Sequence, residues 1–396
     1  MNNRTEAFDV AIIGAGMMGS AAARHAAIMG ARVALIGPPE PREKTSHRGV
    51  FASHYDQARI YRNLDPDLDW SRLARASIAR YAEIAKAGCQ PPFHTPVGTI
   101  MAGPETGSAC DFIQNVRHVS RKLNIEHEEL RAEELSARFP YFDFPGGTLA
   151  LYEAESGGWI NPRDCVAAEI AAAERLGVSI YRQEARRVAE KSDHVVITCA
   201  DGTDVIAAKA IIACGAFSMA KGLLPEPLRL SVYARTVTFF ELPDDEIARL
   251  RTMPSVVYIP PDQSCDPYIL PPVHYPDGKT YLKIGGEPED NELETIEDMK
   301  TWLRGAGDQG VGAFLREQLL KLMPDLAFRS VSFGSCVTSF TASCKPMICP
   351  QTDRLIALTG GNGAAAKSGD ELGRLGAKLA LEGEIAGEGY DATFGP

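Results

Sequence analysis

The sequence predicts an α/β fold, α+β overall, in which a Rossmann-type domain is interleaved with a domain built on an antiparallel sheet. Three observations support this. The chain of 396 residues exceeds one ordinary core. Strand–helix patterns of the nucleotide-binding type occur at its start, middle and end, and the stretch between is mostly β in pattern. We expect one domain from residues 1–90, 150–222 and 335–396, and the other from 91–149 and 223–334.

The first fifty residues predict a βαβ unit. Residues 8–14 (FDVAIIG) form a continuous apolar run, which is typical of a buried parallel strand. Residues 20–30 (SAAARHAAIMG) predict a small-residue helix that ends at Gly30. Residues 31–37 (ARVALIG) predict the second strand, and a loop follows.

The later elements are predicted by apolar spacing and by residues that begin or end helices. Asn161 and Pro162 mark a helix start, and Gly88 and Gly177 mark helix ends. Residues 178–215 alternate as strands, and residues 354–383 read as strand, glycine-rich loop and helix. The other predicted helices span residues 66–88, 110–123, 161–177 and about 294–322.

Composition excludes several classes of protein. A net charge of −11 argues against nucleic acid or anionic membranes as partners. No apolar run reaches the length of a membrane span, and no apolar signal region precedes the first strand. The nine cysteines form no CxxC pair, which argues against a metal site or a disulfide framework. We expect a cytoplasmic monomer or small homo-oligomer with free thiols.

Residues 14–19 (GAGMMG) fit the GxGxxG fingerprint between a strand and a helix. Gly14 permits the tight turn, Gly16 lets the backbone approach a pyrophosphate, and Gly19 lets helix and strand pack closely. The helix N-terminus, with Met18 in its first turn, would favour the negative charge. The fingerprint predicts dinucleotide binding but does not separate FAD from NAD.

The acidic residue expected after the second strand is missing, because Gly37 stands 23 residues after Gly14. Three alternatives remain open from these residues. Glu40 can reach back to the ribose. Arg42 can accept the phosphate of NADP. Backbone and water can replace the carboxylate.

Several separated segments together resemble the amine and amino-acid oxidase family that includes D-amino-acid oxidase, and most closely its sarcosine oxidase and N-methyltryptophan oxidase branch. The resemblance covers essentially the whole chain. Its segments are KTSHRG (44–49), ARIYR (58–62), EAESGGWINP (153–162), AIIACGAFS (210–218), YLKIGG (281–286), GSCVTSFT (334–341) and GGNGAAAKSG (360–369).

This resemblance implies FAD as the cofactor and removes the NADP alternative, since the family carries no nicotinamide. It leaves Glu40 as the substitute for the ribose-binding acid. The residues expected to contact FAD are Gly14, Gly16, Met18, Gly19, Glu40, Ser46, His47, Val188, Cys214, Gly215, Cys336, Gly361, Gly363 and Lys367.

Cys336 matches the cysteine that carries covalent FAD in sarcosine oxidase. A thiolate suits addition to the electron-poor flavin ring, and nearby positive charge would promote its formation. The following Thr338 and Ser339 depart from the aromatic-containing run of the family. The alternative is a buried free thiol.

Two lysines match positions that the family uses. Lys283 matches the lysine that activates oxygen, where a fixed ammonium stabilises developing negative charge. Lys367 opens the last helix after a glycine-rich loop and matches a lysine that contacts the substrate carboxylate. The alternatives are a solvated strand lysine and a surface lysine.

Three further residues complete the expected site. Arg62 matches the arginine that clamps the substrate carboxylate, Arg59 a residue near the flavin, and Tyr268 an active-site tyrosine. The alternative for the arginines is an exposed helix face. Glu287 stands where the family has a substrate-binding histidine. It therefore repels a carboxylate and favours a substrate with a second positive group, or it points into solvent.

The resemblance therefore implies an FAD-dependent oxidase of a secondary or N-methyl amino acid, with hydride passing to the flavin and O2 reduced to H2O2. Two alternatives remain. One is an FAD-dependent dehydrogenase that uses another electron acceptor. The other is a flavin-binding scaffold without turnover, which the departures at Gly37 and Glu287 favour.

Overall fold

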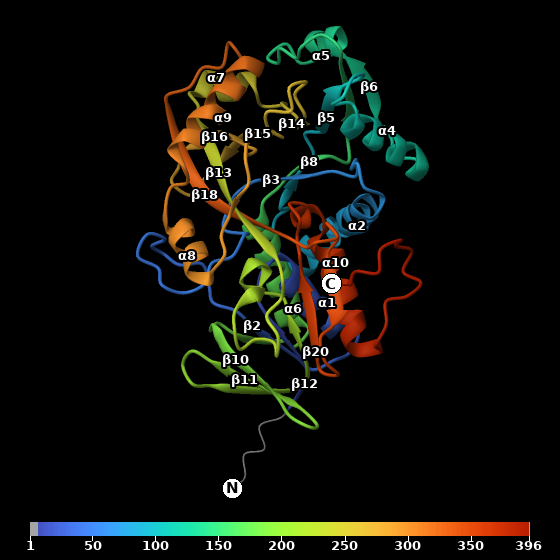
Figure 1. Ribbon diagram of the computed structural model, residues 1–396, viewed down its shortest axis with the longest axis vertical. Coiled ribbons are helices and arrows are strands. Elements are labelled where there is room, and N and C mark those ends of the chain that lie inside the picture. Colours follow the sequence, from blue (N-terminus) through green and yellow to red (C-terminus); the bar gives the residue numbers. More distant parts are fainter. Residues whose placement is uncertain (1–6, 396) are drawn as a thin grey trace.

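A computed structural model describes residues 7–395 and confirms the predicted fold class. Two large sheets lie at opposite ends of the molecule, and a small three-stranded sheet lies between them (Figure 1). Among the described residues, no helix is long and apolar enough to span a bilayer. The same residues contain no cluster of three His, Cys, Asp or Glu side chains placed to hold a metal ion.

The first sheet has the nucleotide-binding topology. Its strand order is β10-β11-β12-β1-β2-β9, with β20 beside β12 and β19 beside β20. Strands β12, β1, β2 and β9 run parallel, as does β20 beside β12. The bounds are β1 (Phe8–Ile13), β2 (Val33–Ile36), β9 (Ser179–Tyr181), β10 (Ala185–Glu190), β11 (Val195–Cys199), β12 (Asp204–Ile212), β19 (Met347–Pro350) and β20 (Leu355–Thr359).

Both faces of this sheet are buried, as the continuous apolar runs predict. Ala11 and Ile13 belong to one core cluster, whereas Val10 and Ile12 belong to another on the opposite face. Helix α1 (Met17–Ile28) packs between α6 (Pro162–Arg175) and α10 (Ala365–Glu382). These three helices come from the start, the middle and the end of the sequence, so their packing brings distant parts of the chain together.

The second sheet has nine strands and is mostly antiparallel, in the order β17-β13-β16-β15-β14-β5-β7-β6, with β18 beside β13. Its strands are β5 (Thr99–Pro104), β6 (Glu128–Arg131), β7 (Thr148–Glu153), β13 (Ser231–Glu241), β14 (Ser255–Tyr258), β15 (Tyr268–His274), β16 (Thr280–Gly285), β17 (Asn291–Glu292) and β18 (Ser330–Phe340). Its helices are α4 (Asp111–Leu123), α5 (Ala132–Arg138), α7 (Asp244–Arg249), α8 (Ile296–Arg304) and α9 (Gln309–Leu322).

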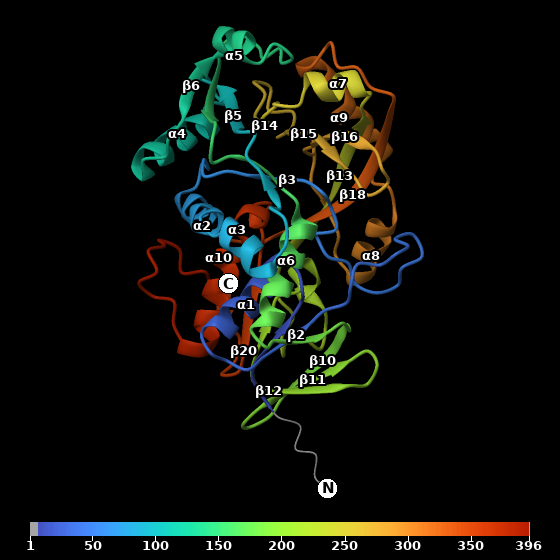
Figure 2. The same cartoon turned by 180° about the vertical axis from the view of Figure 1, so that it is seen from behind.

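The small sheet joins the two halves. It pairs β3 (Arg59–Tyr61) and β4 (His94–Thr95) with β8 (Gly158–Ile160). Both views place β3 between the upper and lower parts of the molecule (Figures 1 and 2). Residues on β3 therefore lie at the junction of the two large sheets.

Two long helices predicted as continuous are each divided into two shorter helices. The helix expected over 66–88 is α2 (Leu68–Ile78) followed by α3 (Tyr81–Gly88). The helix expected over 294–322 breaks between α8 and α9, because Gly307 takes a φ of +86° and a Cβ there would lie 3.0 Å from the Gly334 carbonyl oxygen. Asp308 then caps α9 by accepting the Val311 N–H at 2.9 Å.

Other predicted signals are confirmed. The Asn161 side chain caps α6 by accepting the N–H groups of Arg163 and Asp164. The division of the chain into domains by residue range stays a prediction, and two of its limits, 150 and 335, fall inside β7 and β18.

Candidate active site

The glycine fingerprint lies at the carboxyl edge of the first sheet. Gly14 has a φ of +112°, and a Cβ there would lie 2.2 Å from the Ala213 carbonyl oxygen. A Cβ at Gly19 would lie 1.7 Å from the Gly14 oxygen. Gly16 begins α1 without a side-chain cap, and no acidic residue occupies the first turn. The free N–H groups of this turn therefore suit a pyrophosphate.

The missing acid at Gly37 has a steric cause. A Cβ on Gly37 would lie 2.6 Å from both the backbone nitrogen and the Cβ of Ala15 in the fingerprint loop. No side chain fits there unless the loop moves. The carboxylate expected at this position is thus excluded by the packing of the loop itself.

The Glu40 carboxylate forms a bidentate ion pair with Arg163, whose Nε and NH2 lie 2.8 and 2.7 Å from its oxygens. Arg163 also donates to Gln57 at 2.8 Å. A carboxylate accepts about four hydrogen bonds, so this ion pair leaves capacity for ribose hydroxyls. The contact between Glu40 and the ribose stays a prediction.

The dipeptide Ser-His occurs twice in this region, at residues 46–47 and 53–54, and the second copy lies beside the fingerprint. His54 Nδ1 lies 3.7 Å from the position of a Cβ on Gly16, and this atom is buried without a hydrogen-bond partner. Burial lowers the pKa of His54 to about 4. By contrast, Ser46 is exposed and His47 bonds to the Val50 carbonyl. The repeated dipeptide is the signal that could have identified His54.

The glycine-rich loop of residues 360–363 lies beside the fingerprint and β18. A Cβ on Gly361 would lie 3.8 Å from the Met18 Cε, and one on Gly363 would lie 3.8 Å from the Thr338 Cγ2. Helix α10 then begins with neither a side-chain cap nor an acidic residue in its first turn. The N-termini of α1 and α10 therefore lie close together.

Two other predicted cofactor residues also lie at this edge. Cys214 Sγ lies 3.2 Å from the Ile13 carbonyl oxygen, and Gly215 opens the short helix η1 (Gly215–Met219) with a φ of +56°. Val188 lies instead on edge strand β10, where its N–H donates to Gly222 at 2.8 Å. That N–H is thus already paired within the protein.

Lys283 lies on β16 in a buried charged cluster, and only 1% of its surface is exposed. Its Nζ lies 2.7 Å from Asp56 Oδ2 and 2.5 Å from the Ala58 carbonyl oxygen. Asp56 also pairs with Arg59 and accepts the Tyr275 hydroxyl at 2.9 Å. The alternative of a solvated strand lysine is therefore wrong.

Two opposing influences act on the Lys283 ammonium. Burial lowers the pKa of Lys283 well below its usual range, and Arg59 adds to this lowering. The Asp56 carboxylate, at hydrogen-bond distance, favours the protonated form. Asp56 is a residue that the sequence reasoning missed, although it stands three positions before Arg59.

The predicted flavin-linking cysteine lies against the same cluster. Arg59 NH2 lies 3.6 Å from Cys336 Sγ, and the Trp302 indole N–H donates to the Cys336 carbonyl at 2.8 Å. Cys336 is half-buried on β18 and forms no disulfide. Its side chain shares a strand face with Thr338, whose Cγ2 lies 3.8 Å from the position of a Cβ on Gly363 in the glycine-rich loop.

Tyr268 lies beside this cluster, and Glu287 lies close to Tyr268. Burial raises the pKa of Tyr268 to about 12, with Arg59, Cys336 and Glu287 close enough to act on it. Glu287 does not point into solvent, so that alternative is wrong: it is half-buried and accepts the Thr236 N–H. Burial raises the pKa of Glu287 to about 7.

A second cluster follows β3. Arg62 NH2 lies 3.3 Å from Asp65 Oδ2, and Lys367 Nζ lies 3.2 Å from the same oxygen. Lys367 Nζ also lies 3.2 Å from the Trp70 carbonyl oxygen. Burial lowers the pKa of Lys367 to about 8, and Asp65 opposes that lowering.

The structure thus brings together both predicted carboxylate ligands. Lys367 is 1% exposed, so it is not a surface lysine. The Arg59 and Arg62 side chains are 20% and 16% exposed and lie at β3, so the exposed helix face is also wrong. Asp65 was missed by the sequence reasoning.

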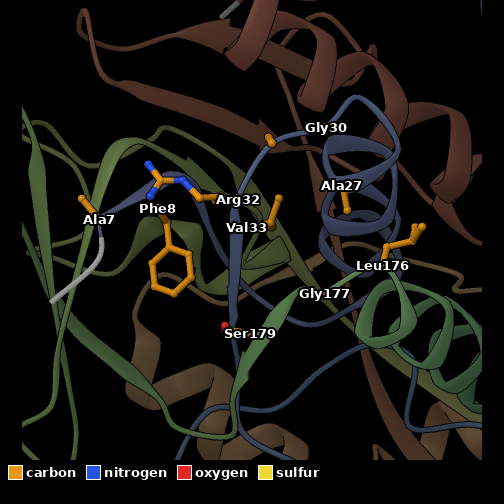
Figure 3. A pocket seen from close by; sticks show the side chains of 10 residues that line it. Ala7, Phe8, Ala27, Gly30, Arg32, Val33, Leu176, Gly177 and Ser179 are labelled. Atoms are coloured by element: carbon orange, nitrogen blue, oxygen red, sulfur yellow. The ribbon is translucent and has the colours of Figure 1, made fainter.

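A separate hollow of about 440 Å³ lies far from these groups. It is lined by Phe8, Ala27, Gly30, Arg32 and Leu176 among others, at the amino end of β1 (Figure 3). Nucleotides bind at the carboxyl ends of parallel strands, so this hollow does not belong to the candidate site.

Comparison with known proteins decides the family. Residues 9–379 match the family model described as FAD dependent oxidoreductase (DAO). The chain belongs to this family. It is therefore an FAD-dependent oxidoreductase, with FAD as its cofactor.

Individual relatives are more distant. The chain is 26% identical over 384 residues to a monomeric sarcosine oxidase of Streptomyces avermitilis, covering 96% of this chain and 95% of that one. It is also 26% identical to an N-methyl-L-tryptophan oxidase of Escherichia coli over 221 residues, 55% of this chain. That match spans about half (56%) of the N-methyl-L-tryptophan oxidase.

Solved structures show the shared fold. NikD, described as an unusual amino acid oxidase essential for nikkomycin biosynthesis, has a TM-score of 0.75 at 20% identity over 99% of this chain and 98% of that one. Glycine oxidase from Geobacillus kaustophilus has a TM-score of 0.72 at 18% identity over 96% of each chain. Membership of the family thus establishes the fold and the cofactor but not the substrate.

Proposed function

We propose that this enzyme oxidises a secondary or N-methyl amino acid and uses O2 as the electron acceptor. The observation that carries the proposal is the meeting of Arg62 and Lys367, 305 positions apart in the sequence, on one buried carboxylate. Two cations at such a point form a binding site for one anionic group of a substrate. The sarcosine oxidase relative, aligned over nearly the whole chain, supports the same substrate class.

The site fits FAD at both ends of the cofactor. The uncapped start of α1 and the buried, unpartnered Nδ1 of His54 suit the pyrophosphate, and the uncapped start of α10 suits negative charge on the flavin ring. The chemistry that bound FAD supplies is removal of a hydride from the carbon next to the substrate nitrogen, followed by transfer of the two electrons to O2, which is reduced to H2O2.

Arg62 and Lys367 orient the substrate through its carboxylate. The Arg62 Nε is buried without a partner, so this donor is free to bind an incoming oxygen. A carboxylate held by a guanidinium and an ammonium has a fixed direction, which places the neighbouring C–N bond for reaction. The main contribution of Arg62 and Lys367 is therefore to position the substrate.

Lys283 is proposed to stabilise the negative charge that develops on O2 as it is reduced. Its ammonium is held by Asp56 and by the Ala58 carbonyl, so it does not reorient when charge develops nearby. Its burial excludes bulk water, which strengthens its interaction with a small anion.

Cys336 is proposed as the point of covalent attachment. The guanidinium of Arg59 lies beside its sulfur and provides the positive surroundings that nucleophilic cysteines have. A tethered cofactor also tolerates a weaker ribose contact, which agrees with the exclusion of an acid at Gly37.

A paired-substrate assay tests the proposed function. The enzyme is offered N-methyl and cyclic amino acids together with the carboxamide of each, and H2O2 is measured. We expect the carboxylates to be oxidised at least tenfold faster, because loss of one charge-assisted contact costs about 1.5–3 kcal/mol. Equal rates for acid and amide would remove the assigned role of Arg62 and Lys367.

A further inference from the structure

Asp65 occupies an unusual place between the two proposed carboxylate ligands. It lies in the turn between β3 and α2 and is only 4% exposed. Its Oδ2 lies 3.3 Å from Arg62 NH2 and 3.2 Å from Lys367 Nζ. Its Oδ1 accepts the Asp67 N–H at 3.0 Å, which fixes the side chain by a turn within its own loop.

The neighbouring carboxylates are already engaged elsewhere. Asp67 binds Lys345 through both oxygens, at 2.5 and 2.6 Å, and Glu153 accepts hydrogen bonds from Asn63 and from the Leu64 N–H. Lys367 otherwise faces the Trp70 carbonyl and the Trp70 ring. Within the described part of the chain, Asp65 is therefore the carboxylate that contacts both cations.

We propose that Asp65 is a positioning residue that holds Arg62 and Lys367 together and keeps Lys367 protonated for substrate binding. This inference rests on the proposed function. Without Asp65, two positive charges would face each other in a buried site, and the ammonium would lose its proton more readily. With Asp65, the three groups carry one net positive charge, which matches one substrate carboxylate.

The proposal predicts a shift in pH dependence. A lysine whose pKa lies near 8 binds an anion below that pH and loses the anion as the pH rises through it. Asp65, Asp67 and Arg62 are the charged groups that act on Lys367, and Asp65 is the stronger of the two carboxylates. Removing its charge therefore moves the loss of anion binding to lower pH, by about one unit or more.

The experiment measures acetate binding to the FAD-loaded enzyme by calorimetry between about pH 6 and about pH 10. In the wild-type enzyme, we expect the affinity to fall as the pH passes through about 8. In Asp65→Asn the fall occurs at lower pH, while Asp65→Glu, which restores the charge, behaves like the wild type. An Asp65→Asn profile that coincides with the wild type overturns the inference, as does an Asp65→Glu profile that shifts like Asp65→Asn.

Two further variants separate the inference from the proposed function. Lys367→Arg cannot lose its proton in this range, so its alkaline fall disappears; a fall that persists there shows that Lys367 does not bind the anion, and the proposed function loses its carboxylate site. Glu246→Gln removes an equally buried carboxylate that pairs with Arg249, also three residues away, on α7. Its profile should match the wild type, and a shift there would contradict the specific role of Asp65.

Discussion

Replacing Lys283 with methionine tests the proposed oxygen site, and its effect on folding can be worked out from the contacts. The change removes the ammonium that donates to Asp56 and Ala58. Asp56 keeps its ion pair with Arg59 and its bond from Tyr275, so no unpaired buried charge remains. The free energy of unfolding should therefore fall by only about 1.5–3 kcal/mol, the worth of one hydrogen bond to a charged group.

The effect on the reaction with O2 should be larger. Removing one fixed group that stabilises developing negative charge typically slows a reaction by about 10²–10³-fold. Stopped-flow measurement separates the two half-reactions. We expect the reduced Lys283→Met enzyme to react with O2 about 10²-fold more slowly, while anaerobic reduction by substrate stays within a few-fold of the wild type.

Lys279→Met is the matched control. Lys279 precedes the same strand, is half exposed and pairs with Glu241, so its loss should leave both half-reactions unchanged. If the Lys283→Met enzyme reacts with O2 at the wild-type rate, the ammonium does not serve oxygen, and a dehydrogenase that uses another acceptor becomes the better reading.

Three further predictions follow. Gly37→Asp restores the acid of the usual fingerprint but should lower FAD loading, because its Cβ would lie 2.6 Å from Ala15. The control Gly146→Ala, at an open position, should bind FAD normally. Full FAD loading of Gly37→Asp would refute the steric explanation. Acid precipitation of the wild type should give a yellow pellet and that of Cys336→Ser a colourless one, whereas a yellow supernatant from the wild type excludes the covalent link. Asp370→Asn should lower the melting temperature and cost about 3–5 kcal/mol, since Asp370 on α10 pairs with Arg24 and His25 of α1 and with Arg80 at the start of α3. An unchanged melting temperature would show that this buried network adds no stability.

The sequence predicts the nucleotide-binding half well, because its signals are local. The apolar runs of β1 and β2, the fingerprint turn and the Asn161 cap each lie within a few residues, and all are confirmed. The breaks within the two long predicted helices are missed, and the second of them depends on tertiary packing. Gly307 lies against Thr236 of β13 and Gly334 of β18.

The sequence identifies the cations of the two buried clusters but misses the carboxylates that pair with them. Lys283, Arg59, Arg62 and Lys367 are found through the resemblance, and the structure gathers them into two clusters at the two ends of β3. Asp56 and Asp65 are their counter-ions, and spacing alone does not distinguish them from the other acidic residues of the loop. Their roles depend on contacts with residues more than 200 positions away.

The same limit explains the fingerprint region. The exclusion of an acid at Gly37 depends on the loop at Ala15 packing over it, and the difference between His47 and His54 depends on which one returns to Gly16. The exclusion at Gly37 is not visible as a sequence pattern, and the repeated Ser-His dipeptide points to both histidines without showing which one reaches Gly16.

The most direct test of the proposed function is an anaerobic mixing experiment with N-methyl and cyclic amino acids, observed through the visible absorption of the bound flavin. The proposal predicts that at least one such amino acid bleaches the wild-type flavin, and that Arg62→Gln bleaches far more slowly at the same concentration. Flavin that stays oxidised with every such amino acid, or that bleaches equally fast in Arg62→Gln, would contradict it.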